Sequence, residues 1–340
     1  MLALGLDIGG ANTKLASSDG SLARSFYAPL WKDRSALKEV LAAFCRSSPV
    51  SSSDSVGVVM TAQLCDCFRT KREGIIYICD TVKSFFENAR FFSAEGTFAT
   101  ASEVSEQPMR FDSTNWLASA KFIAKAFKNA IFVDVGSTTT DIIPIVNGKV
   151  KAAKTDFERL KRKELIYEGV LRTNVSFLLR EVSIEGEKIG VSSEVFAITA
   201  DAYLALGLIS AEEYTCDTPD SVGGKTKEAA LRRLSRVVCA DLEELGVSAA
   251  LSIAEQVKEA QVEHLKDALE EKSEKFRIKR IVSAGIGEFI VREAAEMLAL
   301  DFISIADIYG KAVSAVFPAF SVANLLAEEQ QGCDVSMSEK

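Results

Sequence analysis

One pattern occurs twice in the sequence, and it limits the fold more than any other feature. An apolar run is followed by Asp-x-Gly, then by small hydroxyl or amide residues, and then by another apolar run. The first copy covers residues 4–17 and the second covers residues 132–146. An apolar run that ends in a glycine-bearing turn and then resumes is typical of a β-hairpin. The sequence therefore predicts two similar hairpins, one at the start of the chain and one near its middle.

Regular elements are expected between and after these hairpins. Apolar residues at i, i+3 and i+4 indicate helices, and short continuous apolar runs indicate buried strands. Helices are predicted over residues 35–45, 80–88, 114–127, 226–245, 249–275 and 288–298, and strands over 55–60, 74–79 and 280–284. The other expectations are strand and loop over 150–173, a strand leading into a helix over 193–206, a loop over 217–225 and a solvated tail over 331–340.

The alternation of buried strands with helices predicts an α/β protein whose mixed central sheets are flanked by helices. A chain of 340 residues is long enough for two domains. The first domain is expected over residues 1–128, joined by a C-terminal helix at about 318–330. The second is expected over residues 129–317, with an inserted strand and loop region around 150–192.

Charge and composition narrow the classes of partner. The net charge of −8 argues against binding to nucleic acid, which usually requires a basic face. No apolar run approaches the roughly 18 residues of a membrane helix, and no basic leader precedes the first strand. Seven scattered cysteines do not suggest a disulfide framework. We therefore expect a cytoplasmic protein that acts on small molecules, without a nucleic-acid or membrane partner; a homodimer is compatible with these data.

The two hairpin turns suit a phosphate ligand. Glycine lets a backbone approach an anion closely, and successive backbone N–H groups form a concave anion site. Lys14 adds a positive charge that can reach phosphate oxygens. The residues expected to bind a diphosphate are Gly9, Gly10, Ala11, Asn12, Thr13, Gly136, Ser137, Thr138 and Thr139. The alternative is that both glycine motifs are only structural turns.

An aspartate ends the leading strand of each hairpin, Asp7 in the first and Asp134 in the second. Two carboxylates facing a polyphosphate would repel it without a cation, and Mg²⁺ usually takes only one or two protein carboxylates. The sequence therefore predicts that Asp7 and Asp134 hold Mg²⁺, directly or through its waters. Asp141, which ends the second turn, is expected to be either a general base or a strand-end cap.

A basic segment is the next candidate. Arg69, Lys71 and Arg72 are expected in a loop between two strands of an otherwise acidic protein. Their side chains would either close over the phosphates or carboxylate of a ligand or lie in solvent.

Further polar or glycine-rich positions carry weaker signals. Gly285 and Gly287 follow the strand over 280–284, form a third glycine turn and are also expected to contact the substrate or its diphosphate. The single histidine, His264, is expected on the flank of a solvated, charged helix. Cys65 and Cys67 are interpreted as reduced thiols rather than half of a zinc site, because no second ligand pair lies nearby in the sequence.

These motifs resemble those of a known superfamily. The two hairpins and residues 283–287 are similar to the phosphate-1, phosphate-2 and nucleotide-base motifs of the actin, sugar kinase and Hsp70 superfamily. In that superfamily a Lys or Arg often stands where Lys14 stands. Residues 5–14, 134–141 and 164–170 resemble its hydantoinase/oxoprolinase branch more specifically.

Other segments resemble an archaeal family of methanofuran-biosynthesis synthases. They are Thr61–Leu64, Phe68–Gly74, Asn115–Trp116 and Thr199–Tyr203, and the resemblance extends over about residues 2–325. It implies two actin-like, ribonuclease H-like domains with an interdomain cleft. It also implies a reaction in which (5-(aminomethyl)furan-3-yl)methyl diphosphate condenses with γ-glutamyltyramine. The products would be the aryl ether precursor of methanofuran and pyrophosphate.

This resemblance also implies roles for residues. Mg²⁺, the lysine of the first hairpin and the turn amides would neutralise charge on the departing pyrophosphate. Asp141 is the first expectation for the base that takes the phenol proton, and Asp201 is the second. Arg69, Lys71 or Arg72 would bind the glutamyl carboxylates.

Two other functions stay open on the same fold, because a fold does not fix its chemistry. One is an ATP-dependent small-molecule kinase, and the other is a non-catalytic nucleotide sensor. The kinase reading is weakened by the first turn, which has Gly-Gly-Ala-Asn-Thr where many sugar kinases have Gly-Gly-Thr.

Overall fold

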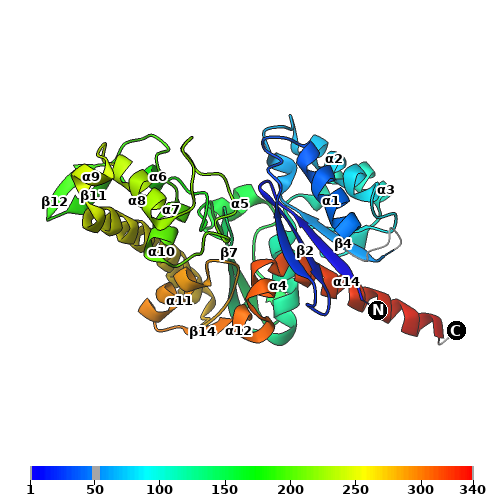
Figure 1. Cartoon of the computed structure of the whole chain (residues 1–340). Helices are drawn as coiled ribbons and strands as arrows, with labels where there is room; N and C mark the ends of the chain where they lie inside the picture. Colours follow the sequence, from blue (N-terminus) through cyan, green and yellow to red (C-terminus); the bar gives the residue numbers. More distant parts are fainter. Residues whose placement is uncertain (1, 48–53, 339–340) are drawn as a thin grey trace. The chain divides into compact units, whose positions relative to one another are not determined.

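In the computed structural model, which describes residues 2–47 and 54–338, the first predicted hairpin begins a six-stranded mixed sheet (Figure 1). The strand order is β3-β2-β1-β4-β5-β6. The pairs β1–β2 and β2–β3 are antiparallel, whereas β1–β4 and β4–β5 are parallel. The strands are β1 Leu4–Ile8, β2 Asn12–Ser17, β3 Ala23–Tyr27, β4 Val56–Met60, β5 Arg90–Phe92 and β6 Phe98–Ala99. The predicted first hairpin and the predicted strand over 55–60 are confirmed.

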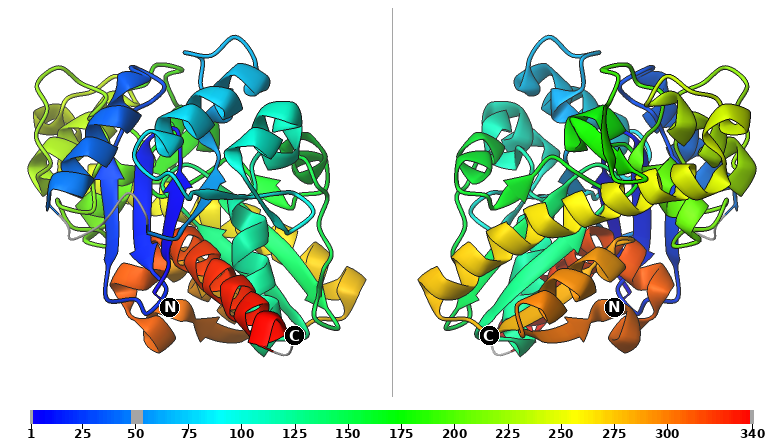
Figure 2. Two further views of the ribbon diagram at one scale, coloured as in Figure 1. Left: turned by 90° about the vertical axis from the view of Figure 1, so that its right-hand side faces the viewer. Right: turned by 90° about the vertical axis from the view of Figure 1, so that its left-hand side faces the viewer.

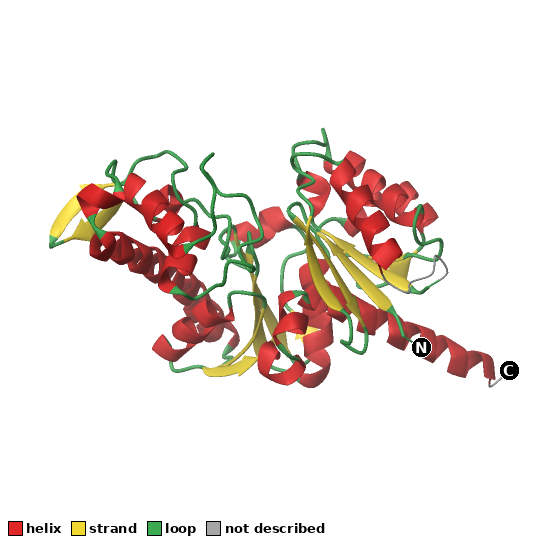
Figure 3. Cartoon of the chain, in the orientation of Figure 1, coloured by secondary structure: helices red, strands yellow, loops and turns green. Residues whose placement is uncertain are grey.

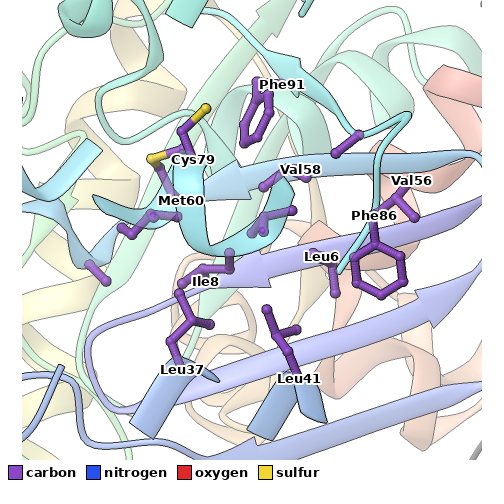
Figure 4. Close-up of a cluster of buried hydrophobic side chains, with 14 of the residues drawn as sticks. Leu6, Ile8, Leu37, Leu41, Val56, Val58, Met60, Cys79, Phe86 and Phe91 are labelled. Carbon is purple, nitrogen blue, oxygen red and sulfur yellow. The ribbon is translucent and has the colours of Figure 1, made fainter. Parts of the chain in front are cut away.

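Alternate residues of β1 and β4 point to opposite faces of this sheet. One face forms an apolar core with helices α1 (Ser35–Ser47) and α2 (Lys71–Lys83). Figure 4 shows this core, with side chains from the two strands and from both helices directed at one another. Its members include Leu6, Ile8, Val58, Met60, Leu37, Leu41 and Cys79.

The opposite face of the sheet packs against α14 (Phe317–Ser338), which also contacts α4 (Asn115–Ala126). Gly5 and Gly57 are register partners on β1 and β4, and both lie under α14. A Cβ on Gly5 would lie 1.8 Å from the carbonyl oxygen of Ala319, and one on Gly57 would lie 3.1 Å from that of Val322. The helix backbone therefore rests directly on strand backbone, which glycine permits.

The chain divides into two structural units, whose bounds are given below, and the remaining elements of the first unit are shorter. They are the 3-10 helices η1 Ala62–Leu64 and η2 Pro108–Phe111, the helices α3 Ala101–Glu106, α5 Asp156–Lys161, α12 Ile305–Tyr309 and α13 Lys311–Ala315, and the strand β9 Lys149–Val150.

The second predicted hairpin is also confirmed, and it lies in another mixed sheet with the order β10-β8-β7-β13-β14, to which β9 is added through β8. Its strands are β7 Ala130–Val135, β8 Thr140–Val146, β10 Leu165–Ile166, β13 Arg280–Ala284 and β14 Asp301–Ser304. The long helix α10 (Val247–Phe276), yellow in Figure 2, packs against α7, α8 and α11. The other elements here are α6 Val175–Leu178, α7 Thr199–Leu206, α8 Lys227–Arg236, α9 Leu242–Leu245, α11 Glu288–Met297 and the hairpin of β11 Glu181–Ile184 and β12 Glu187–Gly190.

The chain divides into two units. The first comprises Met1–Phe132, Ile143–Arg162 and Ser304–Lys340, and the second comprises Val133–Ile142 and Lys163–Ile303. Residues 129–132, 143–162 and 304–317, which were predicted to belong to the second domain, lie in the first unit. Figure 3 shows the strands of the two larger sheets flanked by helices, as predicted for an α/β protein, and the hairpin of β11 and β12 apart from them. Within the described residues, no helix has the length and apolar character needed to cross a membrane.

The predicted strand over 74–79 is wrong, because these residues belong to α2. Thr70 caps this helix by accepting a hydrogen bond from the backbone N–H of Glu73. The buried side chains recur at helical spacing, at Ile75, Ile78 and Val82. A short apolar run does not distinguish a strand from a buried helix face, and the cap with its following turns decides for the helix.

Five other expectations need correction. The helix over 80–88 is only the end of α2, and the helix over 226–245 is broken into α8 and α9, with Cys239 between them at φ 60°. No strand precedes α7 within residues 193–198, and α5 interrupts the strand and loop expected over 150–173. The solvated tail over 331–340 is helical through Ser338 as part of α14, and residues 339–340 lie outside the described residues.

The Gly5 contact leads to a stability prediction. Gly5→Ala should lower the free energy of unfolding by about 1–3 kcal/mol, because the added methyl would force α14 away from β1. Gly190→Ala is the matched control, since nothing lies within 4 Å of its Cβ position. Urea unfolding of both variants measures the difference, and equal stability of the two would contradict this account of α14 packing.

Candidate functional site

Both hairpin turns close with the same backbone hydrogen bond. Gly9 N donates to Asn12 O over 2.9 Å, and Gly136 N donates to Thr139 O over 2.9 Å. Neither glycine is among the described residues with positive φ, so the turn conformation itself does not require glycine. The repeated sequence pattern therefore gives one local structure twice, and the two copies differ in what surrounds them.

The first turn lies against η1 in the first unit. The backbone N–H of Thr61 donates to Ile8 O, and a Cβ on Gly10 would lie 2.8 Å from Cys65 Sγ. Asp7 and Lys14 are cross-strand partners, with Lys14 Nζ 3.9 Å from Asp7 Oδ2. The lysine thus compensates part of the charge of a buried carboxylate.

The other first-turn residues differ in accessibility. Gly9 and Gly10 are half-buried, whereas Ala11, Asn12 and Thr13 are buried. Thr13 has no exposed surface, so its hydroxyl does not face solvent in this conformation. The accessible atoms of this turn are mainly those of its two glycines.

A buried polar cluster beside the first turn was missed by the sequence analysis. Gln63 Nε2 donates to Asp112 Oδ1 over 2.6 Å and to Ser113 Oγ over 2.8 Å. Lys71 Nζ donates to the other oxygen of Asp112, also over 2.6 Å. The sequence carries only an indirect signal of this cluster: Gln63 and Lys71 stand in segments that carry the family resemblance. Asp112 lies far along the chain, so no local pattern connects it to them.

The basic segment is therefore not a loop between two strands. Lys71 and Arg72 stand in the first turn of α2, and Arg69 precedes its cap. The ammonium of Lys71 is held by Asp112, whereas the side chains of Arg69 and Arg72 are exposed. Of the three cations predicted to bind a ligand, Lys71 is thus already paired with a carboxylate of the protein.

The second turn is oriented by the segment 168–172 of the second unit. Val170 N donates to Gly136 O over 3.0 Å, and Leu171 N donates to Ser137 O over 3.0 Å. In a trans peptide the carbonyl of one residue and the N–H of the next point in opposite directions. The N–H groups of Ser137 and Thr138 are therefore directed away from that segment, beside half-buried hydroxyl side chains.

Gly169 makes this arrangement sterically possible. A Cβ on Gly169 would lie 2.4 Å from Thr138 N and 2.6 Å from Ser137 C. No real Cβ tolerates such contacts with backbone, so only glycine lets the two stretches of backbone meet here. The Gly169 carbonyl also accepts a hydrogen bond from Thr199 Oγ1 over 2.9 Å.

The third glycine turn packs against the same hairpin. Gly285 has φ +94°, and its Cβ position lies 2.4 Å from Asp134 Oδ1 and from Val135 O. Gly287 N donates to Val135 O over 3.0 Å, and its Cβ position lies 2.3 Å from the Val135 side chain. Both glycines are thus required by close packing at the end of β7.

The three aspartates predicted for catalysis or metal binding are all buried. Asp7 is 4% exposed, Asp134 is 6% and Asp141 is 7%. Asp141 pairs with Leu165 across β8 and β10, so it lies within a strand rather than in the turn. Among the described residues, no group of three or more His, Cys, Asp and Glu side chains could hold a metal ion, so any metal here would have at most two such ligands.

Asp201 is not available as a base. It has no exposed surface and accepts hydrogen bonds from Arg233 Nε, Tyr214 OH and the backbone N–H of Ile198. Burial lowers the pKa of Arg233, but the hydrogen bonds and charge of Asp201 outweigh it and hold that pKa above its usual value. Arg233 also donates to Gly224 O, so this ion pair anchors the predicted loop over 217–225.

The one histidine has a partner that the sequence analysis did not identify. His264 Nδ1 lies 3.0 Å from Glu168 Oε1 and 3.2 Å from Oε2. The hydrogen bond to Glu168 raises the pKa of His264, against a smaller opposing effect of burial. The two residues are far apart in the sequence, so no local pattern shows the pair.

A cavity of about 700 Å³ lies elsewhere in the first unit, between α4, the β8–β9 turn and the end of α14. Trp116, Lys121, Lys149 and Leu325 are among its lining residues, and none of the predicted site residues belongs to the lining described for it.

Comparisons with known proteins agree with this architecture. The family model described as hydantoinase/oxoprolinase matches residues 54–329. The "(4-{4-[2-(gamma-L-glutamylamino)ethyl]phenoxymethyl}furan-2-yl)methanamine synthase" of Methanocaldococcus jannaschii is 40% identical over 97% of this chain and 98% of its own length. A protein of the same name from Methanococcus vannielii is 42% identical over 62% of this chain and 96% of its own length.

Among solved structures, a nucleotide-free acetone carboxylase matches with a TM-score of 0.54. The match covers 94% of this chain and 70% of that chain, at 12% sequence identity, and therefore supports the fold alone. The family model matches most of the described chain, and the similarity to the Methanocaldococcus jannaschii protein extends over 97% of the sequence. The chain belongs to the hydantoinase/oxoprolinase family.

Proposed function

We propose that the chain condenses (5-(aminomethyl)furan-3-yl)methyl diphosphate with γ-glutamyltyramine and releases pyrophosphate. The observation that carries this proposal is the 40% identity to a synthase along almost the full length of both chains. The name of that relative describes a phenoxymethyl-furan product, which contains an ether between a phenol oxygen and a furanylmethyl carbon. The bond from that carbon to the diphosphate breaks, its electrons leave with pyrophosphate, and the phenol oxygen attacks the carbon and gives up its proton.

The second turn supports binding of the leaving diphosphate. The Ser137 and Thr138 N–H groups are directed away from the segment that holds the turn, and the nearby hydroxyls add donors. Gly136 carries a further indication, because its Cβ position meets only Thr139 O, at an ordinary 3.5 Å. The fold does not need glycine there, which favours close approach of a ligand to the backbone.

The first turn contributes charge. Lys14 is partly exposed beside Asp7, and we propose that its ammonium binds the diphosphate while Gly9 and Gly10 allow close contact. Donors that stabilise a leaving anion lower the barrier when they are already oriented toward it.

The donor set also fits Mg²⁺. Asp7 and Asp134 are buried carboxylates, and the half-buried hydroxyls of the second turn add the oxygen ligands that this cation prefers. Bound there, Mg²⁺ would neutralise diphosphate charge. The contact between Asp134 and Gly285 fixes the carboxylate at the end of β7 without an intervening side chain.

The acceptor side of the site rests on fewer observations. Asp141 remains the proposed base for the phenol proton, since Asp201 is fully engaged in its ion pair. Arg69 and Arg72 are the proposed partners of the glutamyl carboxylates, because both side chains are exposed at the start of α2.

The reaction itself is tested without ATP. The protein, Mg²⁺, the furanylmethyl diphosphate and γ-glutamyltyramine should give pyrophosphate and the ether in equal amounts, measured by mass spectrometry. Omission of γ-glutamyltyramine is the control for simple hydrolysis of the diphosphate. ATP turnover with a small alcohol would support the kinase instead, and tight nucleotide binding without turnover would support the sensor.

The second turn is tested by Gly136→Ala. The methyl fits the fold, so stability should be unchanged, but it should weaken pyrophosphate binding by about tenfold or more through loss of charge-assisted hydrogen bonds. Isothermal titration calorimetry measures the affinity, and Gly190→Ala serves as the control with an open Cβ position. Unchanged affinity in Gly136→Ala would remove this turn from the site.

The metal proposal is tested by Asp7→Asn and Asp134→Asn. The wild-type protein should bind pyrophosphate about tenfold more tightly with Mg²⁺ than with EDTA, and each variant should lose most of that difference. Asp33→Asn, at an exposed carboxylate, should behave like the wild type. The same dependence on Mg²⁺ in all four proteins would exclude both aspartates as ligands.

A further inference from the structure

A continuous series of contacts connects His264 to the second turn. His264 Nδ1 lies 3.0 Å from an oxygen of the Glu168 carboxylate, which is 7% exposed. The backbone carbonyl of Glu168 accepts a hydrogen bond from Thr140 Oγ1 over 2.8 Å. The next residue, Gly169, lies against the peptide between Ser137 and Thr138. The histidine's partner thus belongs to the segment that lies against the turn.

Helix α10 holds this segment at two points. Gln261 precedes His264 by one helical turn, and residues at this spacing share a face of a helix. Its Nε2 donates to Gly169 O over 3.3 Å, and its Oε1 accepts from Tyr203 OH over 2.6 Å. The amide contact is neutral at every pH, whereas the histidine contact depends on the protonation of the ring.

The charged groups that act on His264 come from two places. Glu168 faces it from the loop after β10, and Asp267 on α10 adds a weaker attraction. Together they raise the pKa of His264 above its ordinary value. The ion pair between His264 and Glu168 is therefore fully formed below about pH 6.5, the pKa of histidine in an unfolded chain. It is lost as the pH rises through the higher pKa of His264 in the folded protein.

Titratable groups on α7, α8 and α11, which pack against α10, have partners of their own. Tyr203 on α7 is buried, which raises its pKa further above the ordinary phenol value. Glu293 on α11 is paired with Lys258, and Arg233 on α8 is paired with Asp201. Helix α10 contacts β11 through Gln256, whose side chain is neutral, so this contact does not change with pH.

We propose that His264 and Glu168 are positioning residues that hold the segment 168–172 against the second turn and so direct its N–H groups at the diphosphate. The proposal rests on the proposed function of that turn as a diphosphate site. Protonation of His264 keeps the segment fixed, and deprotonation loosens it and weakens anion binding. His264 itself contacts neither the diphosphate nor the reacting carbon.

The test is the affinity for pyrophosphate with Mg²⁺ between pH 6 and pH 9, measured by isothermal titration calorimetry. Pyrophosphate titrates in this range, so the measured quantity is the ratio of dissociation constants for His264→Gln and wild type at each pH. We expect the variant to bind about three- to tenfold more weakly at pH 6 and equally well at pH 9.

Two further variants sharpen the result. His264→Lys keeps a cation beside Glu168 across this range and should retain the affinity of the wild type at low pH. Lys266→Gln, on the same helix but paired with Glu263, should match the wild type throughout. Hydrogen–deuterium exchange at residues 137–138 and 168–172 should increase in His264→Gln at pH 6 and not in Lys266→Gln.

The outcomes separate the two proposals. No pyrophosphate binding by the wild type at any pH would overturn the diphosphate site itself. Binding by the wild type with a ratio of one at every pH, and unchanged exchange in His264→Gln, would overturn only the positioning role of the His264–Glu168 pair.

Discussion

The second turn depends on contact between two stretches of backbone. Gly169 lies against the peptide of Ser137 and Thr138 at a distance that no side chain allows. Hydrogen bonds from residues 170 and 171 then hold the turn carbonyls on that side. Because a trans peptide places its N–H opposite its carbonyl, the same contact determines where the turn donors point. The direction of these donors is thus a consequence of the packing behind the turn, and the anion binding that we propose for it would depend on that packing.

Glycine has a similar role in the first unit, where it supports packing rather than a site. Gly5 and Gly57 let the backbone of α14 rest on β1 and β4. This contact covers the face of the sheet opposite the apolar core with α1 and α2. The start of β1 is therefore fixed from both faces, and the turn that follows it begins from a rigid strand.

Much of the fold was predictable from the sequence, because its signals are local. The two hairpins were found from the Asp-x-Gly pattern, and β4, α1 and α4 were found from apolar spacing. The error at α2 arose where an apolar run, Ile75–Ile78, fits a strand as well as a helix face. The break after α8 was missed because nothing in a charged, helix-favouring sequence marks the left-handed residue Cys239.

The sequence by itself determined the two turns, their aspartates, the family and the acidic character of the chain, since each depends on neighbouring residues or on composition. Only the tertiary structure decided which charges are already paired. It joined Lys71 to Asp112, Asp201 to Arg233 and Glu168 to His264, all across long stretches of chain. Such pairs are set by how helices and loops from distant parts of the chain pack together, which leaves no periodic trace in the sequence.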